Sequence, residues 1–164
     1  MSNINDQDYS LSNLDLDKFI KEIEQKGANI FETNKIKKNT DIEKIFAGGG
    51  HAVLFAGPRT SGHWMTLLRD RDNNIYFIDS LAEHPDEYNK NILKCIKQYN
   101  GLKIFINKTK LQLDDEVTCG RYPTIFIACH KMGLHPSQTI DFLINGKKKY
   151  KTIDNFIYEL TKKI

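Results

Sequence analysis

Two apolar runs separated by a polar turn are the feature that most constrains how this chain folds. Residues 64–69 and 75–79 are mostly apolar and aromatic, and the residues between them, 70–74, are Asp, Arg, Asp, Asn and Asn. Asp and Asn are common turn formers, so the pattern predicts an antiparallel β-hairpin. Residues that pair across this hairpin have numbers that sum to about 144. We therefore expect His63 to lie beside Asp79, within a residue or two of register.

The remaining elements are predicted from the spacing of apolar residues and from the positions of glycine and proline. The expected helices lie at residues 14–26, from 40 to the glycines at 48–50, and at 85–99, 120–132, 136–144 and 152–163. Two further strands are expected at residues 51–56 and 102–107, and the basic segment 145–150 is expected to be a loop. The predicted fold class is α+β, with a central, mainly antiparallel sheet of about four to five strands flanked by helices.

The most apolar of these helices begins close to a cysteine. Residues 122–129 read Tyr, Pro, Thr, Ile, Phe, Ile, Ala and Cys, which predicts a buried central helix. Pro123 fits only in the first turn of a helix, so the helix should start close to Cys119. Backbone N–H groups and the positive dipole end at a helix start stabilise a thiolate. The central helix is thus expected to carry a nucleophile at its N-terminus.

Length and charge favour one soluble domain. The chain has 164 residues, of which 40% are hydrophobic, and a domain of this size buries roughly two-thirds of its unfolded surface. We expect a single domain over residues 1–164, with residues 1–13 flexible. The net charge of +3 comes from 24 basic and 21 acidic residues, a mixture unlike that of a dedicated nucleic-acid binder.

The cysteines and the N-terminal segment point to a reducing compartment. Cys95, Cys119 and Cys129 form neither an even disulfide set nor a metal-binding pair, and histidines do not complete a metal-ligand spacing. The first residues are polar and acidic, without the basic and apolar parts of a secretion signal, and no run of eighteen apolar residues occurs. We expect a protein that is not secreted and does not enter a membrane.

Four side chains together have the chemistry of a cysteine hydrolase. In chain order they are His63, Asp79, Gln112 and Cys119. In such an enzyme an imidazole holds the thiolate as an ion pair, a carboxylate orients the imidazole, and a side-chain amide donates to the oxyanion. Asp79 ends an apolar strand, where an unpaired carboxylate is costly, so a histidine on the neighbouring strand is its natural partner.

Structural interpretations of the same residues stay open at this point. A strand-end aspartate can cap a loop, a loop glutamine is often solvated, and a free cysteine often packs in the core. The competing histidines are His51, His84, His130 and His135. Cys95 lies on an apolar helix face and Cys129 lies in the middle of a helix, so both are assigned to the core.

The motifs around these residues resemble those of the adenain group of viral maturation proteases and, more distantly, the ubiquitin-like-protein-specific proteases. Gln112 stands seven positions before Cys119, and His63 has the context Gly, His, Trp, Met. The match covers about residues 50–132. It implies that Gln112 and the backbone N–H of Cys119 form the oxyanion hole, and that Trp64 lines the groove for the residues before the scissile bond.

Two features of the resemblance narrow and qualify it. Gly, Arg and Tyr follow Cys119, as in the related enzymes of virophages, Polinton-type elements and large DNA viruses. Asp79 stands where adenain itself has a glutamate, and the chain is shorter than the adenovirus enzymes. The resemblance thus implies a cysteine endopeptidase that cleaves capsid or other virion precursors after small or glycine-containing sites. It would act as a monomer in the virion and the host-cell cytoplasm.

Two alternatives remain at this level. One is a protease that removes ubiquitin-like modifiers from host proteins, and the other is a noncatalytic binding module. The sequence requires no cofactor, although the resemblance to adenain allows DNA or a peptide as an activator. A basic patch suited to weak DNA binding consists of Lys147, Lys148, Lys149 and Lys151, and a solvated lysine loop is the commoner alternative.

Overall fold

The computed structural model describes residue 18 and residues 20–23, 25–26, 29–47, 49–57, 62–101, 104–113 and 120–161. The segment 1–13, which the sequence predicts to be flexible, lies outside these residues. Cys119, the predicted nucleophile, also lies outside them. Within the described part of the chain, no helix is long and apolar enough to cross a membrane.

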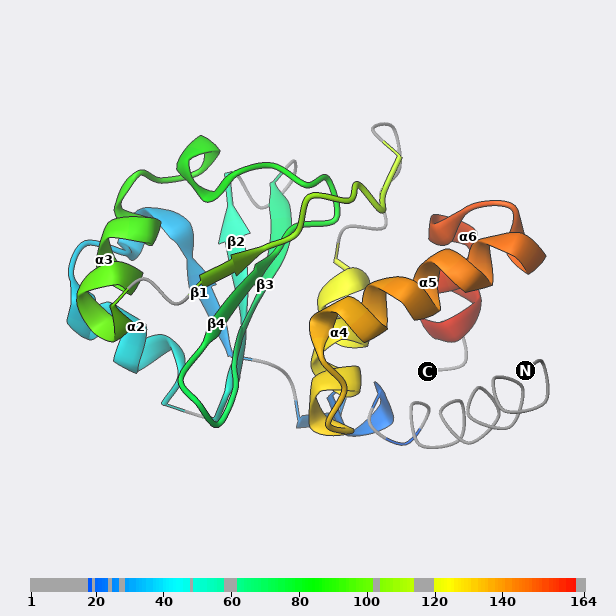
Figure 1. Cartoon of the computed structure of the whole chain (residues 1–164), viewed down its shortest axis with the longest axis horizontal. Helices are drawn as coiled ribbons and strands as arrows, with labels where there is room; N and C mark the ends of the chain where they lie inside the picture. Colours follow the sequence, from blue (N-terminus) through cyan, green and yellow to red (C-terminus); the bar gives the residue numbers. More distant parts are fainter. Residues whose placement is uncertain are drawn as a thin grey trace.

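A five-stranded mixed sheet forms the centre of the molecule (Figure 1). Its strands, in both spatial and chain order, are β1 (Ile30–Glu32), β2 (His51–Ala56), β3 (His63–Arg69), β4 (Ile75–Ile78) and β5 (Ile104–Ile106). The longer central pairings, β2 with β3 and β3 with β4, are antiparallel, and both edge strands pair in parallel. The predicted α+β class is confirmed. Strand β1 was not predicted, because three residues are too few to show an alternating pattern.

The hairpin of β3 and β4 has the register that the sequence predicts. Thr66 pairs with Ile78 and Arg69 pairs with Ile75. The turn is held by Asp70, whose carboxylate accepts the N–H of Asn74 at 2.9 Å and the hydroxyl of Tyr76 at 2.6 Å. This register fixes which residues meet at the other end of the hairpin, where β3 begins and β4 ends.

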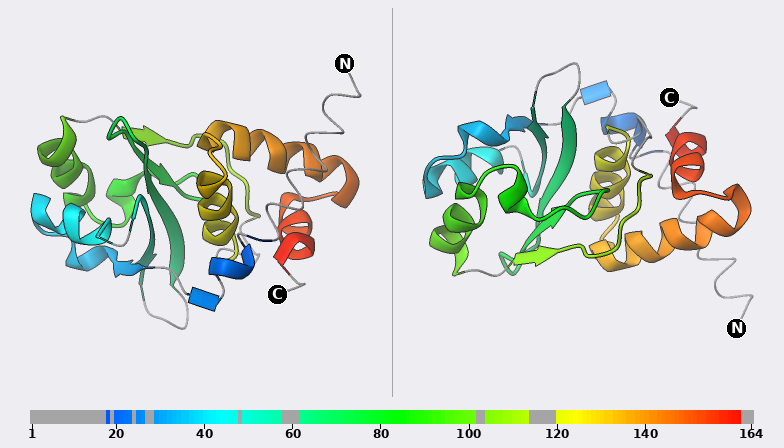
Figure 2. Two further views of the ribbon diagram at one scale, coloured as in Figure 1. Left: turned by 90° about the horizontal axis from the view of Figure 1, so that it is seen from below. Right: turned by 90° about the horizontal axis from the view of Figure 1, so that it is seen from above.

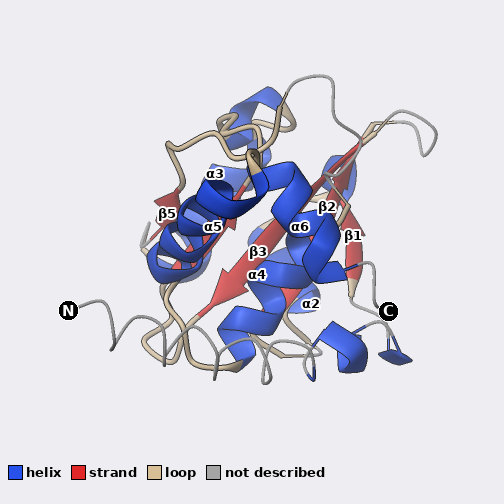
Figure 3. Ribbon diagram, turned by 90° about the vertical axis from the view of Figure 1, so that its right-hand side faces the viewer, coloured by secondary structure: helices blue, strands red, loops and turns tan. Residues whose placement is uncertain are grey.

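Helices cover both faces of the sheet. Helices α2 (Asn39–Ile45) and α3 (Asn91–Asn100) lie on one face, and α4 (Tyr122–Lys131) lies on the other, with α5 (Pro136–Tyr150) and α6 (Ile153–Thr161) outside it (Figures 2 and 3). Two short 3₁₀ turns, η1 (Thr33–Lys35) and η2 (Pro85–Glu87), precede α2 and α3. Each face has its own apolar core, because successive strand residues point to opposite sides.

The prediction of a buried central helix is confirmed by α4. Seven of its ten residues are buried, and Pro123 sits in its first turn, as expected. The helix begins at Tyr122, two residues later than predicted. The assignment of Cys95 and Cys129 to the core is also confirmed, since each is 2% exposed.

The helix predicted over residues 85–99 is wrong in its first part. The structure has the short turn η2, then a break, and then α3 from Asn91. At the break, Asn89 accepts the N–H of Asn91 at 2.9 Å through its side-chain oxygen and donates to the carbonyl of Thr33 at 2.6 Å. Its neighbour Tyr88 donates its hydroxyl to Asp79. Tertiary hydrogen bonds at these two residues thus replace a continuous helix.

The loop predicted over residues 145–150 is also wrong, because α5 continues to Tyr150. Gly146 is not a helix breaker here. A Cβ atom at this position would lie 1.9 Å from two ring carbons of Phe156, so glycine is what lets α6 pack closely on α5. Lys147, Lys148 and Lys149 therefore lie exposed on the last turns of a helix.

Candidate active site

His63 and Asp79 meet where β3 begins and β4 ends. The register of the hairpin, extended by one pair, would place Asp79 opposite Met65, two residues after His63 on the same face. The Nε2 atom of His63 lies 2.6 Å from Oδ1 of Asp79. Asp79 is fully buried, and the side chain of His63 is 15% exposed. The pair therefore sits at the surface end of the sheet, with the carboxylate shielded from water and the imidazole reachable.

Three neighbours fix the position of Asp79. Its Oδ1 accepts the N–H of Leu81 at 2.9 Å, and its Oδ2 accepts the hydroxyl of Tyr88. The side chain of Asn107 brackets its backbone, accepting the N–H of Asp79 at 2.8 Å and donating to its carbonyl at 2.7 Å. The Leu81 N–H and the Tyr88 hydroxyl, which donate to the carboxylate, offset the cost of burying it. They also leave the carboxylate little freedom to rotate away from His63.

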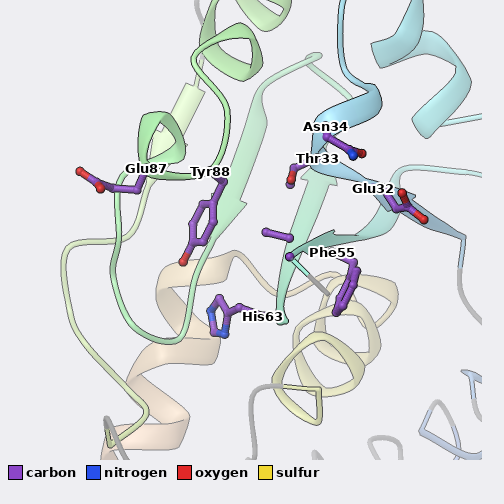
Figure 4. Close-up of a pocket in the computed structure, with 9 residues that line it drawn as sticks. Glu32, Thr33, Asn34, Phe55, His63, Glu87 and Tyr88 are labelled. Carbon is purple, nitrogen blue, oxygen red and sulfur yellow. The ribbon is translucent and has the colours of Figure 1, made fainter. Parts of the chain in front are cut away.

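Tyr88 contacts both members of the pair. Its ring lies nearly parallel to that of His63, with centroids 6.0 Å apart, and Figure 4 shows its hydroxyl pointing toward His63. Burial, the hydrogen bond to Asp79 and the charges of Asp79, Glu83 and Glu87 all raise the pKa of Tyr88. The phenol therefore stays protonated at neutral pH and remains a donor to the carboxylate.

Gln112 is buried, with 4% of its surface exposed, and Ser80 holds it. The carbonyl of Ser80 accepts the N–H groups of Leu111 at 2.8 Å and of Gln112 at 2.9 Å. The Ser80 hydroxyl donates to Oε1 of Gln112 at 2.6 Å. This bond sets the orientation of the amide: the carbonyl end faces Ser80, so the NH₂ end is the one that points the other way. An oxyanion donor needs that orientation.

The chain on either side of Cys119 is described up to Leu113 and from Gly120. A Cβ atom at Gly120 would lie 3.4 Å from Cδ1 of Trp64, so the backbone at Gly120 passes close to the indole ring. Trp64 follows His63 directly on β3. The structure thus brings the residue after Cys119 against the residue after His63. Of the predicted site residues, His63 and Asp79 contact each other directly. Gln112 is hydrogen-bonded to Ser80, the residue that follows Asp79 in the sequence.

A pocket of about 480 Å³ opens beside His63 (Figure 4). Aromatic walls come from Phe55 and Tyr88, and Glu32 and Glu87 are also among its lining residues. Trp64 is not among the lining residues, although its ring contacts that of Phe55, with centroids 4.5 Å apart. The pocket therefore lies on the Tyr88 side of His63, separate from the surface that Trp64 presents to Gly120.

Cys129 and the histidines other than His63 lie in surroundings that explain them without a catalytic role. Burial raises the pKa of Cys129 to about 11, which keeps its thiol protonated and unreactive at neutral pH. His84 and His135 each accept a backbone N–H two residues on, at the starts of η2 and α5. Burial lowers the pKa of His51 and of His130. Within the described residues, no three His, Cys, Asp or Glu side chains are grouped to hold a metal ion.

Ser80, Tyr88 and Asn107 are the site residues that sequence reasoning missed. Asn107 follows β5 directly, as Asp79 follows β4, and these two strands are parallel neighbours. A polar residue at the end of each of two adjacent parallel strands is a signal that could have paired them. Tyr88 carried no such signal, because it falls inside the helix predicted over residues 85–99.

No family model matches the chain. It is 26% identical over 129 residues to the uncharacterized protein V9 of Sputnik virophage, a match that covers 69% of this chain and 72% of that protein. The chain resembles a virophage protein. This similarity suggests a viral origin, as the motif after Cys119 predicts. The name of the virophage protein states no activity.

Proposed function

We propose that the protein is a cysteine endopeptidase with Cys119 as nucleophile, His63 as general base and acid, Asp79 as the orienting carboxylate and Gln112 as an oxyanion donor. The observation that carries the proposal is the 2.6 Å contact between Nε2 of His63 and Oδ1 of the buried Asp79. A histidine so held in one orientation is the central part of a catalytic triad.

The arrangement suits acyl transfer. The Cys119 thiol passes its proton to His63, and the thiolate attacks the carbonyl carbon of the scissile amide to form a tetrahedral oxyanion. Gln112 and the N–H of Cys119 donate to this oxyanion, and His63 returns the proton to the leaving amine. Water then attacks the thioester with His63 as base, which releases the acid and restores the thiol. Because Nε2 of His63 is engaged by Asp79, Nδ1 is the atom proposed to exchange the proton.

The proposed substrates are capsid or other virion precursor polypeptides, cleaved after small or glycine-containing sites in the virion or the host-cell cytoplasm. The similarity to a virophage protein supports the viral setting. Removal of ubiquitin-like modifiers is the second candidate and uses the same chemistry. The basic residues Lys147, Lys148, Lys149 and Lys151, all exposed, are proposed only as an accessory DNA contact.

The test is hydrolysis of glycine-containing peptides by the purified chain, compared with cleavage of a ubiquitin-like probe. Cys119→Ala and His63→Ala should each abolish turnover, and Gln112→Ala should lower the rate by about 10²–10³. Cys129→Ala is the matched cysteine control and should keep activity in a folded protein. If Cys129→Ala were inactive and Cys119→Ala active, the assignment of the nucleophile would be wrong.

A further inference from the structure

The segment that carries Gln112 is held from a second side by helix α6. Asp154, in the first turn of α6, is 2% exposed. Its Oδ2 accepts the N–H of Leu113 at 2.9 Å, and its Oδ1 accepts the hydroxyl of Tyr122 at 2.9 Å. One buried carboxylate thus joins the residue after Gln112 to the first residue of α4.

Tyr122 strengthens this connection. It is 2% exposed and opens the helix three residues after Cys119 in the sequence. Its hydroxyl lies 3.2 Å from the carbonyl of Leu111, the residue before Gln112. Together, Asp154 and Tyr122 contact the backbone on both sides of Gln112.

We propose that Asp154 and Tyr122 are positioning residues that set the distance between the oxyanion donor Gln112 and the start of α4. The inference rests on the proposed function. It gives a role to α6, a helix that carries none of the proposed catalytic residues. Ser80 holds Gln112 toward Asp79, and the Asp154–Tyr122 pair holds it toward α4. The amide is therefore fixed relative to both the histidine side and the nucleophile side of the site.

The chemistry of the contact supports positioning more than simple packing. A buried carboxylate is costly, and an apolar side chain would fill the same space beside Leu113 at no such cost. A carboxylate with two acceptor oxygens can hold two donors from different segments at fixed geometry. Such preorganisation matters where a donor must already stand at the oxyanion position when charge develops.

Another tyrosine and aspartate pair offers a matched control. Tyr76 is 6% exposed and donates its hydroxyl to Asp70 at 2.6 Å, at the turn end of the hairpin, away from His63. Tyr76→Phe and Tyr122→Phe therefore each remove a buried tyrosine hydroxyl that donates to an aspartate carboxylate. Only Tyr122→Phe should act on Gln112.

The experiment is steady-state hydrolysis of a glycine-containing peptide by the full chain and its variants. Tyr122→Phe should lower kcat about tenfold with KM changed less than about twofold, because the hydroxyl that holds the segment of Gln112 through Asp154 and Leu111 is lost and no contact with the substrate is. In a Gln112→Ala background the same change should cost less than about twofold, since the group it positions is gone. Tyr76→Phe should leave kcat unchanged.

The outcomes separate the two claims. Equal losses from Tyr122→Phe with and without Gln112, an unchanged kcat in Tyr122→Phe, or a rise in KM alone would each overturn the positioning role. Failure of the proposed function would appear earlier, as no hydrolysis by the unaltered chain. Amide hydrogen exchange at Leu113 tests the contact without activity: Asp154→Ala, which removes both acceptor oxygens, should accelerate it, and an unchanged rate would overturn the inference.

Discussion

Tyr88→Phe should separate catalytic alignment from stability more cleanly than any other single change. The substitution removes the hydroxyl that donates to Oδ2 of Asp79 and keeps the ring beside His63. Oδ1 keeps its contacts with His63 and the N–H of Leu81. The carboxylate therefore loses the donor on one oxygen, and with it the restraint that keeps its plane facing the imidazole.

The cost in stability follows from the nature of the bond. A hydrogen bond to a charged partner contributes about 1.5–3 kcal/mol to the free energy of unfolding. For a chain of this length each kcal/mol shifts Tm by about 2–4 °C, so we expect a loss of about 3–12 °C. Tyr76→Phe, which removes a hydroxyl from Asp70, should cost a similar amount. Thermal unfolding alone thus cannot distinguish the two variants.

Activity distinguishes them. Tyr88→Phe should lower both kcat and the alkylation rate of Cys119 by about tenfold, whereas Tyr76→Phe should change neither. The pH dependence of stability from 10 to 12 does not distinguish them, because burial and the hydrogen bond to Asp70 also raise the pKa of Tyr76, to about 12. Because the pKa of Tyr88 in the folded protein is raised above its ordinary value of 10, its stabilisation is present below pH 10 and is lost as the pH rises further. That loss should be missing in Tyr88→Phe. Equal alkylation rates in the two variants would refute the proposed role of Tyr88.

Three further predictions concern the carboxylate, the helix contact and the histidines. Asp79→Asn keeps the shape of the side chain but removes its charge, so the protein should fold while kcat falls by orders of magnitude in peptide hydrolysis; near-normal kcat would exclude Asp79 as the orienting group. Gly146→Ala should lower the free energy of unfolding by about 1–3 kcal/mol, and Tm with it, because the new Cβ overlaps the ring of Phe156. Replacing a helix glycine by alanine usually raises Tm, so a raised Tm would contradict the contact. His51 and His130 have lowered pKa values in the folded state, so their contribution to stability is present above pH 6.5 and is lost as the pH falls. Tm should therefore drop on acidification, and it should drop less steeply in His51→Gln.

The hairpin is the part of the site that sequence could predict. The turn formers at 70–74 and the apolar runs beside them determine the register, and this register brings His63 and Asp79 to the same end of the hairpin. The pattern is local and has a period of two, so few alternatives compete with it.

The supporting residues could not be predicted in the same way. Tyr88 reaches Asp79 only because the helix expected there breaks at Asn89, whose side chain is held by the carbonyl of Thr33, 56 positions away in the chain. Gly146 reads as a helix breaker in sequence, and only the packed ring of Phe156 explains its place inside α5. Asp154 is 42 positions from Gln112, and no periodicity connects them. Long-range tertiary contacts outweigh local propensity at each of these places.

The most direct test of the central claim is the reaction of the purified chain with iodoacetamide at about pH 6, followed by mapping of the labelled cysteine. An ordinary thiol of pKa about 8.5 reacts slowly at this pH, whereas a thiolate held by an imidazole reacts fast. We predict rapid labelling of Cys119 that disappears in His63→Ala, with Cys95 and Cys129 unlabelled in the folded protein. Slow labelling of Cys119, equal in the unaltered chain and in His63→Ala, would contradict the proposal that His63 activates a nucleophilic cysteine.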